Sequence, residues 1–373
     1  MKTESIELPA MQKEKGSICV SVIVPTHRLS PERRADQLEV EKAIKKAKDL
    51  LTSKFKNSDI KQLQQSLDDL FESIDFTKNL EGLGIYVSPK INRAVHFPFP
   101  VEEKIMVAHK FEMRELLYYS SYEQSYMVLL LSEKGLKLFE GSWDELNEIE
   151  DQNFPKEYVE EYDYSTPSRG TSFAGQAQLK SFEKDKGELE SIRFKDFFKS
   201  ADELLTEYLK PDKALILMGV EKELAWFEKI TKHSQNIINK IQGSYNYSNP
   251  KELSDIVWPV MREHLDQEKE LLIKEYSEKI GEEMGVSGIQ DIWQSAQEGK
   301  AFKLLVEKDY RCPGYVDTDE YLLYLDQPET PHKVLDDAVD ELIELVLQKN
   351  GQVYFTENNQ LKDFGRMLLI TRY

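Results

Sequence analysis

The chain has 373 residues, a formal net charge of −19 and an isoelectric point near 4.9. This length exceeds that of a typical single-core domain and predicts two or three domains. The excess of acidic residues excludes nonspecific attraction of the whole molecule to a polyphosphate, so any contact with nucleic acid has to be local.

Several classes of protein are not indicated by the sequence. Cys19 and Cys312 lie far apart, the six histidines show no ligand spacing, and the phosphate-loop pattern GxxxxGK[ST] is missing. Residues 1–16 are polar and lack the apolar core of a signal peptide, and no apolar run has the length of a membrane span. We therefore expect a cytoplasmic protein that binds no membrane, metal or other cofactor.

Residues 1–125 are predicted to form a mixed α/β domain. A β-branched run at 18–25 predicts a strand, and Ser30-Pro31 after it has the pattern of a helix start with a capping hydroxyl. The other elements predicted in this domain are helices at 32–52, 59–76 and 112–119 and a strand at 82–87.

Residues 126–270 predict a central domain in which helices cover a mixed sheet. Its first element is a hairpin, and a later apolar run closed by Gly219 predicts a short buried strand. The elements in chain order are strands at 126–131 and 136–139, a helix at 197–209, a strand at 215–219 and a helix at 222–230.

A very long helical pattern begins at Asn249-Pro250, and Pro259 within it predicts a bend. We place a domain boundary inside this helix near Glu270. The remaining residues, 271–373, predict an α/β/α sandwich. Its elements are helices at 289–297 and 334–348, the second ending at Asn350-Gly351, and strands at 303–307, 353–355 and 367–370.

One short loop stands out between the hairpin and the helix of the central domain. It contains Ala174, Gly175 and Gln176, and the stretch from 165 to 182 around it carries Arg169 and Lys180 but no acidic residue. A glutamine is thus expected on a locally basic arm of an acidic protein.

The order of these blocks resembles the class-I peptide-chain release factors of archaea and eukaryotes and their relative Pelota, and more closely the bacterial members of that superfamily. In this chain, as in the family, a hairpin is followed by the glutamine loop, a helix and a strand, here the one ending in Gly219. Residues 270–307 and 334–373 resemble the family's third domain. The resemblance covers about residues 126–373 and is weaker before them.

This resemblance implies an RNase H-like central domain and a C-terminal sandwich similar to kink-turn-binding ribosomal proteins. It also implies a ribosome- and tRNA-bound release or rescue factor in which Gly175 and Gln176 promote hydrolysis of the peptidyl-tRNA ester. Arg169, Lys180 and Arg193 are then candidates for contacts to RNA phosphates. The third domain contacts a translational GTPase in relatives, which makes its acidic helix a candidate partner surface.

Two departures from the family keep alternatives open. Ala174 stands where the family has its first glycine, and alanine fits there only if its φ is negative. The stop-codon motif Asn-Ile-Lys-Ser is replaced by Asn57-Ser58-Asp59-Ile60-Lys61-Gln62. A noncatalytic, Pelota-like ribosome-binding adaptor and a tRNA-cleaving relative therefore remain as alternatives to a hydrolase.

Two further patterns have both a structural and a functional interpretation. Thr26, His27 and Arg28 follow the first strand and could bind an anion at the next helix start, or simply form a strand exit and helix cap. The acidic residues of the last helix are typical of a solvated helix face; they are Asp336, Asp337, Asp340, Glu341 and Glu344.

Overall fold

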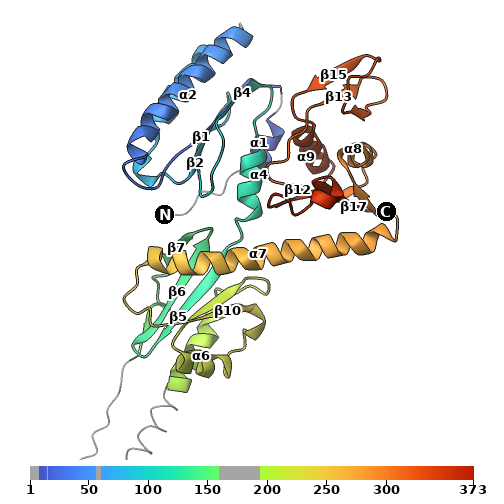
Figure 1. Cartoon of the computed structure of the whole chain (residues 1–373). Coiled ribbons are helices and arrows are strands. Elements are labelled where there is room, and N and C mark those ends of the chain that lie inside the picture. The colour runs from blue at the N-terminus through green and yellow to red at the C-terminus, as the bar shows by residue number, and fades with distance from the viewer. Residues whose placement is uncertain (1–7, 15, 56–59, 159–193) are drawn as a thin grey trace, which may run out of the picture. The chain divides into compact units, whose positions relative to one another are not determined.

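The computed structural model describes residues 8–14, 16–55, 60–158 and 194–373 (Figure 1). The chain packs into two compact units, Met1–Tyr122 together with Asp266–Tyr373, and Glu123–Leu265. The second unit ends at Leu265, and the predicted central domain spans residues 126–270. The first contains the N-terminal and C-terminal regions, each with its own sheet, and the fold is the mixed α/β type predicted.

The N-terminal region is built on an antiparallel sheet with the strand order β3-β2-β1-β4. In β1 the alternate residues Val20, Val22 and Val24 face a core under α2 and α3, whereas Cys19 and Ile23 face a second core that includes α1 and α4. The elements are α1 (Leu8–Lys13), β1 (Cys19–Pro25), α2 (Arg33–Lys54), α3 (Ile60–Ser73), β2 (Gly82–Val87), β3 (Asn92–Phe97), β4 (Lys104–Ala108) and α4 (Arg114–Ser121).

The predicted helix cap at Ser30-Pro31 is wrong. Residues 29–32 form a turn, α2 begins at Arg33, and its N-cap residue Glu32 makes no side-chain cap. The amide of Arg33 donates to the carbonyl of Leu29 and that of Arg34 to the carbonyl of Pro31, so backbone groups of the turn satisfy donors at the helix start. Strands β3 and β4 were not predicted.

The central unit has a mixed sheet with the strand order β10-β9-β5-β6-β7. Strands β10, β9 and β5 are parallel, and β6 and β7 continue antiparallel, which is the RNase H-like arrangement expected. Helical residues 194–205 and α6 pack on one face of this sheet. The elements are β5 (Tyr126–Ser132), β6 (Gly135–Ser142), β7 (Glu145–Glu148), β8 (Lys156–Glu157), β9 (Leu215–Gly219), α6 (Glu221–Glu228), β10 (Ile237–Gln242) and the first part of α7 (Pro250–Ile280).

The C-terminal region is the predicted α/β/α sandwich. Its sheet has the order β11-β17-β12-β16; Tyr276 of α7 packs on one side, and α8 and α9 contact the same strands. The elements after α7 are β11 (Gly285–Ser287), α8 (Ile289–Gln297), β12 (Ala301–Glu307), β13 (Gly314–Asp317), β14 (Leu323–Tyr324), β15 (His332–Leu335), α9 (Ala338–Gln348), β16 (Gln352–Thr356) and β17 (Met367–Thr371).

One prediction in this region is wrong. Residues 334 and 335 belong to strand β15 instead of the last helix, and β14, β13 and β15 form a small separate sheet that was not predicted. Asp337 is the N-cap of α9, with its carboxylate accepting from the amide of Val339 at 3.0 Å. The helix ends as expected, with Asn350 at a φ of 59° just beyond it. Among the described residues, no helix is long and apolar enough to cross a membrane.

Candidate functional site

The predicted glutamine loop lies outside the described residues. This applies to Gly175 and Gln176 and to the three candidate RNA contacts, Arg169, Lys180 and Arg193. The roles of these five residues stay predictions. The structure does describe both points at which segment 159–193 joins the central unit.

These two points are held together by an aromatic stack. The ring of Tyr158 lies on the ring of Phe194, with centroids 4.3 Å apart and planes 20° apart, and Trp226 of α6 lies 5.9 Å from Phe194. The amide of Tyr158 donates to the carbonyl of Lys134 at 2.9 Å. Segment 159–193 therefore starts and ends at one place on the central unit, which we call the aromatic base (Tyr158, Phe194 and Trp226).

A glycine in the hairpin allows this arrangement. Gly135 in β6 pairs with Glu157 of β8, and its φ is 153°. A Cβ atom at this position would lie 2.4 Å from the carbonyl oxygen of Lys156. Any larger residue would push β8, and with it the aromatic base, away from the hairpin.

His27 points an imidazole edge outward from a fixed position at the end of β1. Its Nδ1 lies 2.7 Å from Oδ1 of Asp36, its backbone amide donates to Oδ2 at 2.8 Å, and Asn79 donates to the same Oδ2 at 2.7 Å. The Asp36 side chain is 2% exposed and that of His27 51%. Because Asp36 holds Nδ1, the Nε2 edge is the part of the ring free of this contact, an arrangement that suits proton transfer or binding of one polar group.

The neighbouring predicted residues make structural contacts. The Thr26 hydroxyl donates to the carbonyl of Leu80 at 2.9 Å, and Arg28 bonds to Glu81 at 3.3 Å and to the carbonyl of Pro98 at 3.1 Å. Thr26 and Arg28 thus connect the end of β1 to the segments on either side of β2 and β3. Anion binding by Thr26, His27 and Arg28 stays a prediction.

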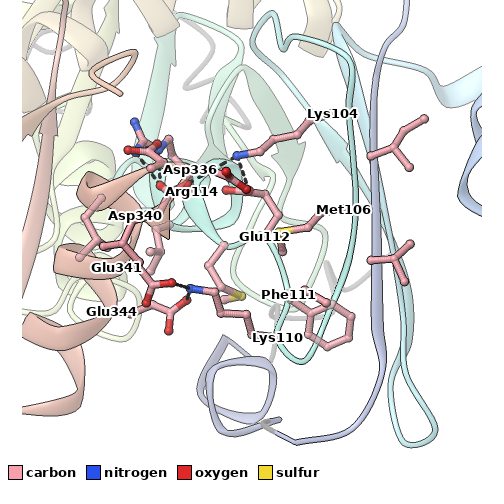
Figure 2. Close-up of a pocket in the computed structure, with 18 of the residues that line it drawn as sticks. Lys104, Met106, Lys110, Phe111, Glu112, Arg114, Asp336, Asp340, Glu341 and Glu344 are labelled. Carbon is pink, nitrogen blue, oxygen red and sulfur yellow. Dashed lines mark hydrogen bonds and ion pairs between the residues drawn. The ribbon is translucent and has the colours of Figure 1, made fainter. Parts of the chain in front are cut away.

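A charged cavity of about 450 Å³ lies within the first unit, between the N-terminal region and α9 (Figure 2). Lys54, Lys104, Lys110 and Arg114 line it from the N-terminal region, and we call these four residues the cationic wall. The acidic residues of α9 line the opposite side. We call Asp337, Asp340, Glu341 and Glu344 the acidic wall.

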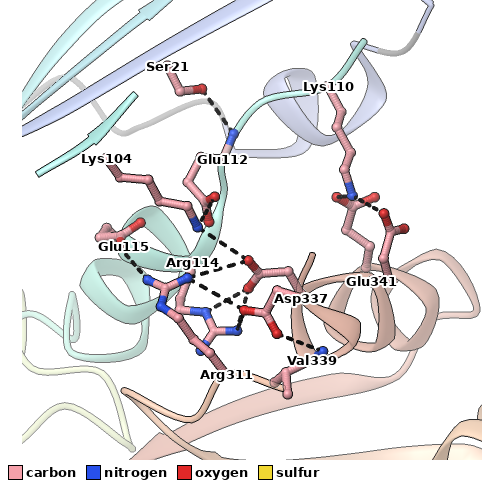
Figure 3. A network of polar contacts seen from close by, with 12 residues as sticks. Ser21, Lys104, Lys110, Glu112, Arg114, Glu115, Arg311, Asp337, Val339 and Glu341 are labelled. Carbon is pink, nitrogen blue, oxygen red and sulfur yellow. Dashed lines mark hydrogen bonds and ion pairs between the residues drawn. The ribbon is translucent and has the colours of Figure 1, made fainter. Parts of the chain in front are cut away.

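Arg114 is the most buried contact between the two walls (Figure 3). Its side chain is 3% exposed; Nε donates to Asp340 at 2.6 Å and Nη2 to Asp337 at 2.9 Å. Nη1 donates to the carbonyl of Tyr310. The guanidinium fork therefore meets two carboxylates and a backbone acceptor at once, which fixes its orientation.

The lysines complete the contact at the more exposed rim. Lys110 Nζ lies 2.9 Å from Glu341 and 2.8 Å from Glu344, and Lys104 pairs with Glu112 and, at 3.5 Å, with Asp340. The expected solvated helix face is therefore wrong for the four residues of the acidic wall, because basic residues of the N-terminal region cover them. Asp336 is exposed as expected.

Crowding of carboxylates perturbs their ionisation. Burial raises the pKa of Glu112 to about 7, Asp340 and Glu115 add to the rise, and Lys104 opposes it. Burial also acts to raise the pKa of Asp340, but Arg114 and Lys104 hold it below its ordinary value. Burial opposes the charge of Lys110, yet Glu344 and Glu341 keep its pKa raised.

Sequence reasoning missed this cavity. The spacing of the acidic wall, i, i+3, i+4 and i+7 from Asp337, places its members on one face of a helix, and that was the available signal. Nothing in the sequence showed that Arg114, more than 200 positions earlier, would meet it. Among the described residues, no group of three or more His, Cys, Asp or Glu side chains is placed to hold a metal ion.

Comparison with known proteins gives a family match for the central part of the chain. Residues 125–300 match the model of bacterial archaeo-eukaryotic release factor family 3. This range contains the hairpin, the segment with Gly175 and Gln176, and α7. No curated protein matches the chain.

Similar solved structures include Pelota of Archaeoglobus fulgidus, at 14% identity and a TM-score of 0.38, covering 78% of this chain and 84% of that one. Dom34 of S. cerevisiae, described as translation termination-like, has 12% identity and a TM-score of 0.38 over 77% of this chain and 73% of its own. The archaeal termination factor aRF1 has 13% identity and a TM-score of 0.25, covering 98% and 96%.

The family match confirms the relationship that the order of the blocks suggested. Over residues 125–300, this chain is similar to family 3 of the bacterial archaeo-eukaryotic release factors.

Proposed function

We propose that this protein is a ribosome-associated release- or rescue-type factor that hydrolyses the ester bond between peptide and tRNA. The observation that carries the proposal is the family match over residues 125–300, which include Gly175 and Gln176. The aromatic base supports it, because it joins the segment bearing these residues to a rigid sheet. As a ribosome-bound factor the protein acts in the cytoplasm.

The reaction places few demands on the protein. A water oxygen attacks the ester carbonyl carbon, the carbonyl oxygen gains negative charge, and the C–O bond to the tRNA breaks, so that the peptide leaves as an acid and the tRNA regains its hydroxyl. A backbone amide at Gln176 can donate to the developing oxyanion, and the glutamine side chain can restrict access to a water-sized nucleophile. Neither role requires a titrating residue.

Contacts to RNA are assigned to the basic residues of the same segment. Arg169, Lys180 and Arg193 can neutralise phosphates locally in a protein whose net charge is −19. Thr26, His27 and Arg28 are proposed as a further anion contact, with the Nε2 edge of His27 as the group presented to the ligand.

The test is a single-turnover release assay with ribosomes that carry labelled peptidyl-tRNA. Wild-type protein is expected to release peptide, and Gln176→Ala is expected to abolish release. Gln178→Ala, two positions away in the same segment, is the matched control and should retain activity. Absence of release by the wild type, or equal release by Gln176→Ala, contradicts the hydrolase.

Ala174 favours a second candidate function, a noncatalytic adaptor that occupies the ribosome without cleaving the ester. Co-sedimentation with ribosomes without release, together with release gained by Ala174→Gly, would identify it. A tRNA-cleaving activity is distinguished by mapping the RNA end: ester hydrolysis leaves an intact 3′ end, and strand cleavage does not.

A translational GTPase stays a proposed partner of the C-terminal region. In this structure the acidic wall is covered by the N-terminal region, so a partner that uses this face has to displace Lys104 and Lys110. A pull-down with candidate GTPases at low and high salt tests the proposal, and salt-independent failure to bind argues against it.

A further inference from the structure

The cationic wall is a local exception in a strongly acidic chain. Its four members come from α2, β4, the β4–α4 connection and α4, so residues from positions 54 to 114 converge on one cavity. Lys54 also donates to the carbonyl of Val107 at 3.4 Å, which ties the end of α2 to β4. Such convergence of cations on one side of a cavity is the charge pattern of an anion-binding surface.

The acidic wall occupies this surface with oxygen atoms. Arg114 contacts Asp340 through Nε and Nη2 and Asp337 through Nη2, and Lys110 lies between Glu341 and Glu344 (Figure 3). Arginine forks bind carboxylate and phosphate with the same bidentate geometry. The side chains of α9 therefore fill positions that phosphate oxygens could take.

We propose that the cationic wall is a binding surface for an RNA phosphate backbone, and that the acidic wall of α9 covers it until RNA displaces it. The proposal rests on the proposed function for the presence of RNA as a ligand. It adds to that function a second RNA contact, remote in sequence from the glutamine segment, and an intramolecular competitor for it.

The contact between the walls is suited to exchange. Most of the paired lysines and carboxylates are partly exposed, as Lys104 at 28% and Lys110 at 30% show, so salt and water compete for them. Six carboxylates take part in these ion pairs, namely the four of the acidic wall together with Glu112 and Glu115. They share four cations, which are Lys104, Lys110, Arg114 and Arg311. Burial raises the pKa of Glu112, and the neighbouring carboxylates of Asp340 and Glu115 add to the rise.

Apolar contacts stabilise the arrangement in which the acidic wall covers the cationic wall. The ring of Tyr118 in α4 packs against Phe355 of β16 at 5.9 Å, and its hydroxyl donates to Glu357 at 3.1 Å. RNA therefore has to bind the uncovered state with enough preference to shift the equilibrium. Removing carboxylates from the acidic wall should lower the preference for the uncovered state that RNA needs in order to bind.

The experiment measures binding of a short fluorescein-labelled single-stranded RNA to the full chain by anisotropy at several salt concentrations. The uncovering variant is Asp340→Asn/Glu341→Gln/Glu344→Gln. The charge-matched control is Asp319→Asn/Glu320→Gln/Asp326→Asn, which removes three exposed carboxylates outside the cavity. We expect the uncovering variant to bind at least about tenfold more tightly than the control, which corresponds to about 1.4 kcal/mol.

A second set of variants identifies the surface that binds. Adding Lys104→Ala/Lys110→Ala to the uncovering variant should return the affinity to that of the control and reduce the salt slope. Equal RNA affinities of the uncovering variant and the control overturn the proposal. A gain in RNA affinity that persists after both lysines are replaced overturns it as well. Equally tight binding of poly-L-glutamate overturns the assignment to RNA.

The outcome is independent of ester hydrolysis. The same measurements in a Gln176→Ala background should give the same affinities, because the described residues that line the cavity come from residues 54–117 and 333–344. Absence of release by the wild type, with these affinities retained, contradicts the proposed function alone. Release by the wild type, with equal RNA affinities of the uncovering variant and the control, contradicts this inference alone. Thermal unfolding of each variant establishes that it is folded.

Discussion

Replacing Glu112 with glutamine should stabilise the protein at neutral and alkaline pH. The carboxyl group is buried, with 4% of its side chain exposed, and its pKa rises from 4.5 to about 7 in the folded chain. A carboxyl group whose folded pKa lies above its unfolded value favours folding in its protonated form, and this stability is lost as the pH rises from 4.5 to 7. Glutamine keeps the shape and stays neutral throughout.

The magnitude follows from the shift. At 1.36 kcal/mol per pKa unit, the raised pKa of Glu112 lowers the free energy of unfolding by about 3 kcal/mol at pH 8. This is an upper value, because Asp340 and Glu115 contribute to the same rise. We expect Glu112→Gln to gain about 1–3 kcal/mol at pH 8 and less than about 1 kcal/mol at pH 5. The raised pKa of Glu112 already includes the attraction between its carboxylate and Lys104, so the loss of this contact is not counted again.

Chemical denaturation of the full chain at pH 5, 6, 7 and 8 measures this difference, and Glu102→Gln, an exposed neighbour, is the control. The gain should appear between pH 5 and pH 7 and level off above. A destabilised Glu112→Gln at pH 8, or a difference that does not change with pH, would refute the raised pKa of Glu112 in the folded protein.

Four further substitutions test other parts of the structure. Arg114→Leu leaves two carboxylates of α9 without their buried cation and should cost about 3–5 kcal/mol, measured by the same denaturation. Asp36→Ala removes the acceptor of three donors and should cost about 1–3 kcal/mol, while NMR of the His27 ring should show that its orientation is no longer fixed. Tyr158→Ala should slow peptide release more than Tyr158→Phe, which keeps the stacked ring; equal rates would contradict a positioning role for the aromatic base. Gly135→Ala should lower the melting temperature, because its Cβ meets the carbonyl oxygen of Lys156, and an unchanged value would contradict that close approach.

Elements with strong local patterns could be predicted from the sequence. The predicted bounds lie close to the observed ones for β1, with its β-branched run, for the hairpin of β5 and β6, and for α7, with its periodic apolar residues. Several strands were missed for a physical reason. Strand β10 has no fully buried residue and depends on pairing with β9, and β13–β15 are two to four residues long, so neither alternation nor length identified them.

The candidate sites divide in a similar way. The glutamine loop was singled out by its order between flanking elements and by the absence of acidic residues from 165 to 182, and its role stays a prediction. The partnership of Arg114 with Asp337 and Asp340 depends on tertiary folding, which brings residues 223 and 226 positions apart together. The carboxylate that holds His27 lies in the first turn of the following helix, where Asp36 was available as a signal but resembled an ordinary surface residue.

The aromatic base also makes the glutamine segment separable from the rest of the protein. Because Tyr158 and Phe194 lie in contact, the 35 residues between them begin and end at neighbouring points, and a short Gly/Ser linker can close the same gap. The entropy of closing a loop changes slowly with its length, so such an excision should leave the central sheet folded. The shortened chain would separate the two halves of the proposed function, since it should still reach the ribosome while having no means to release the peptide.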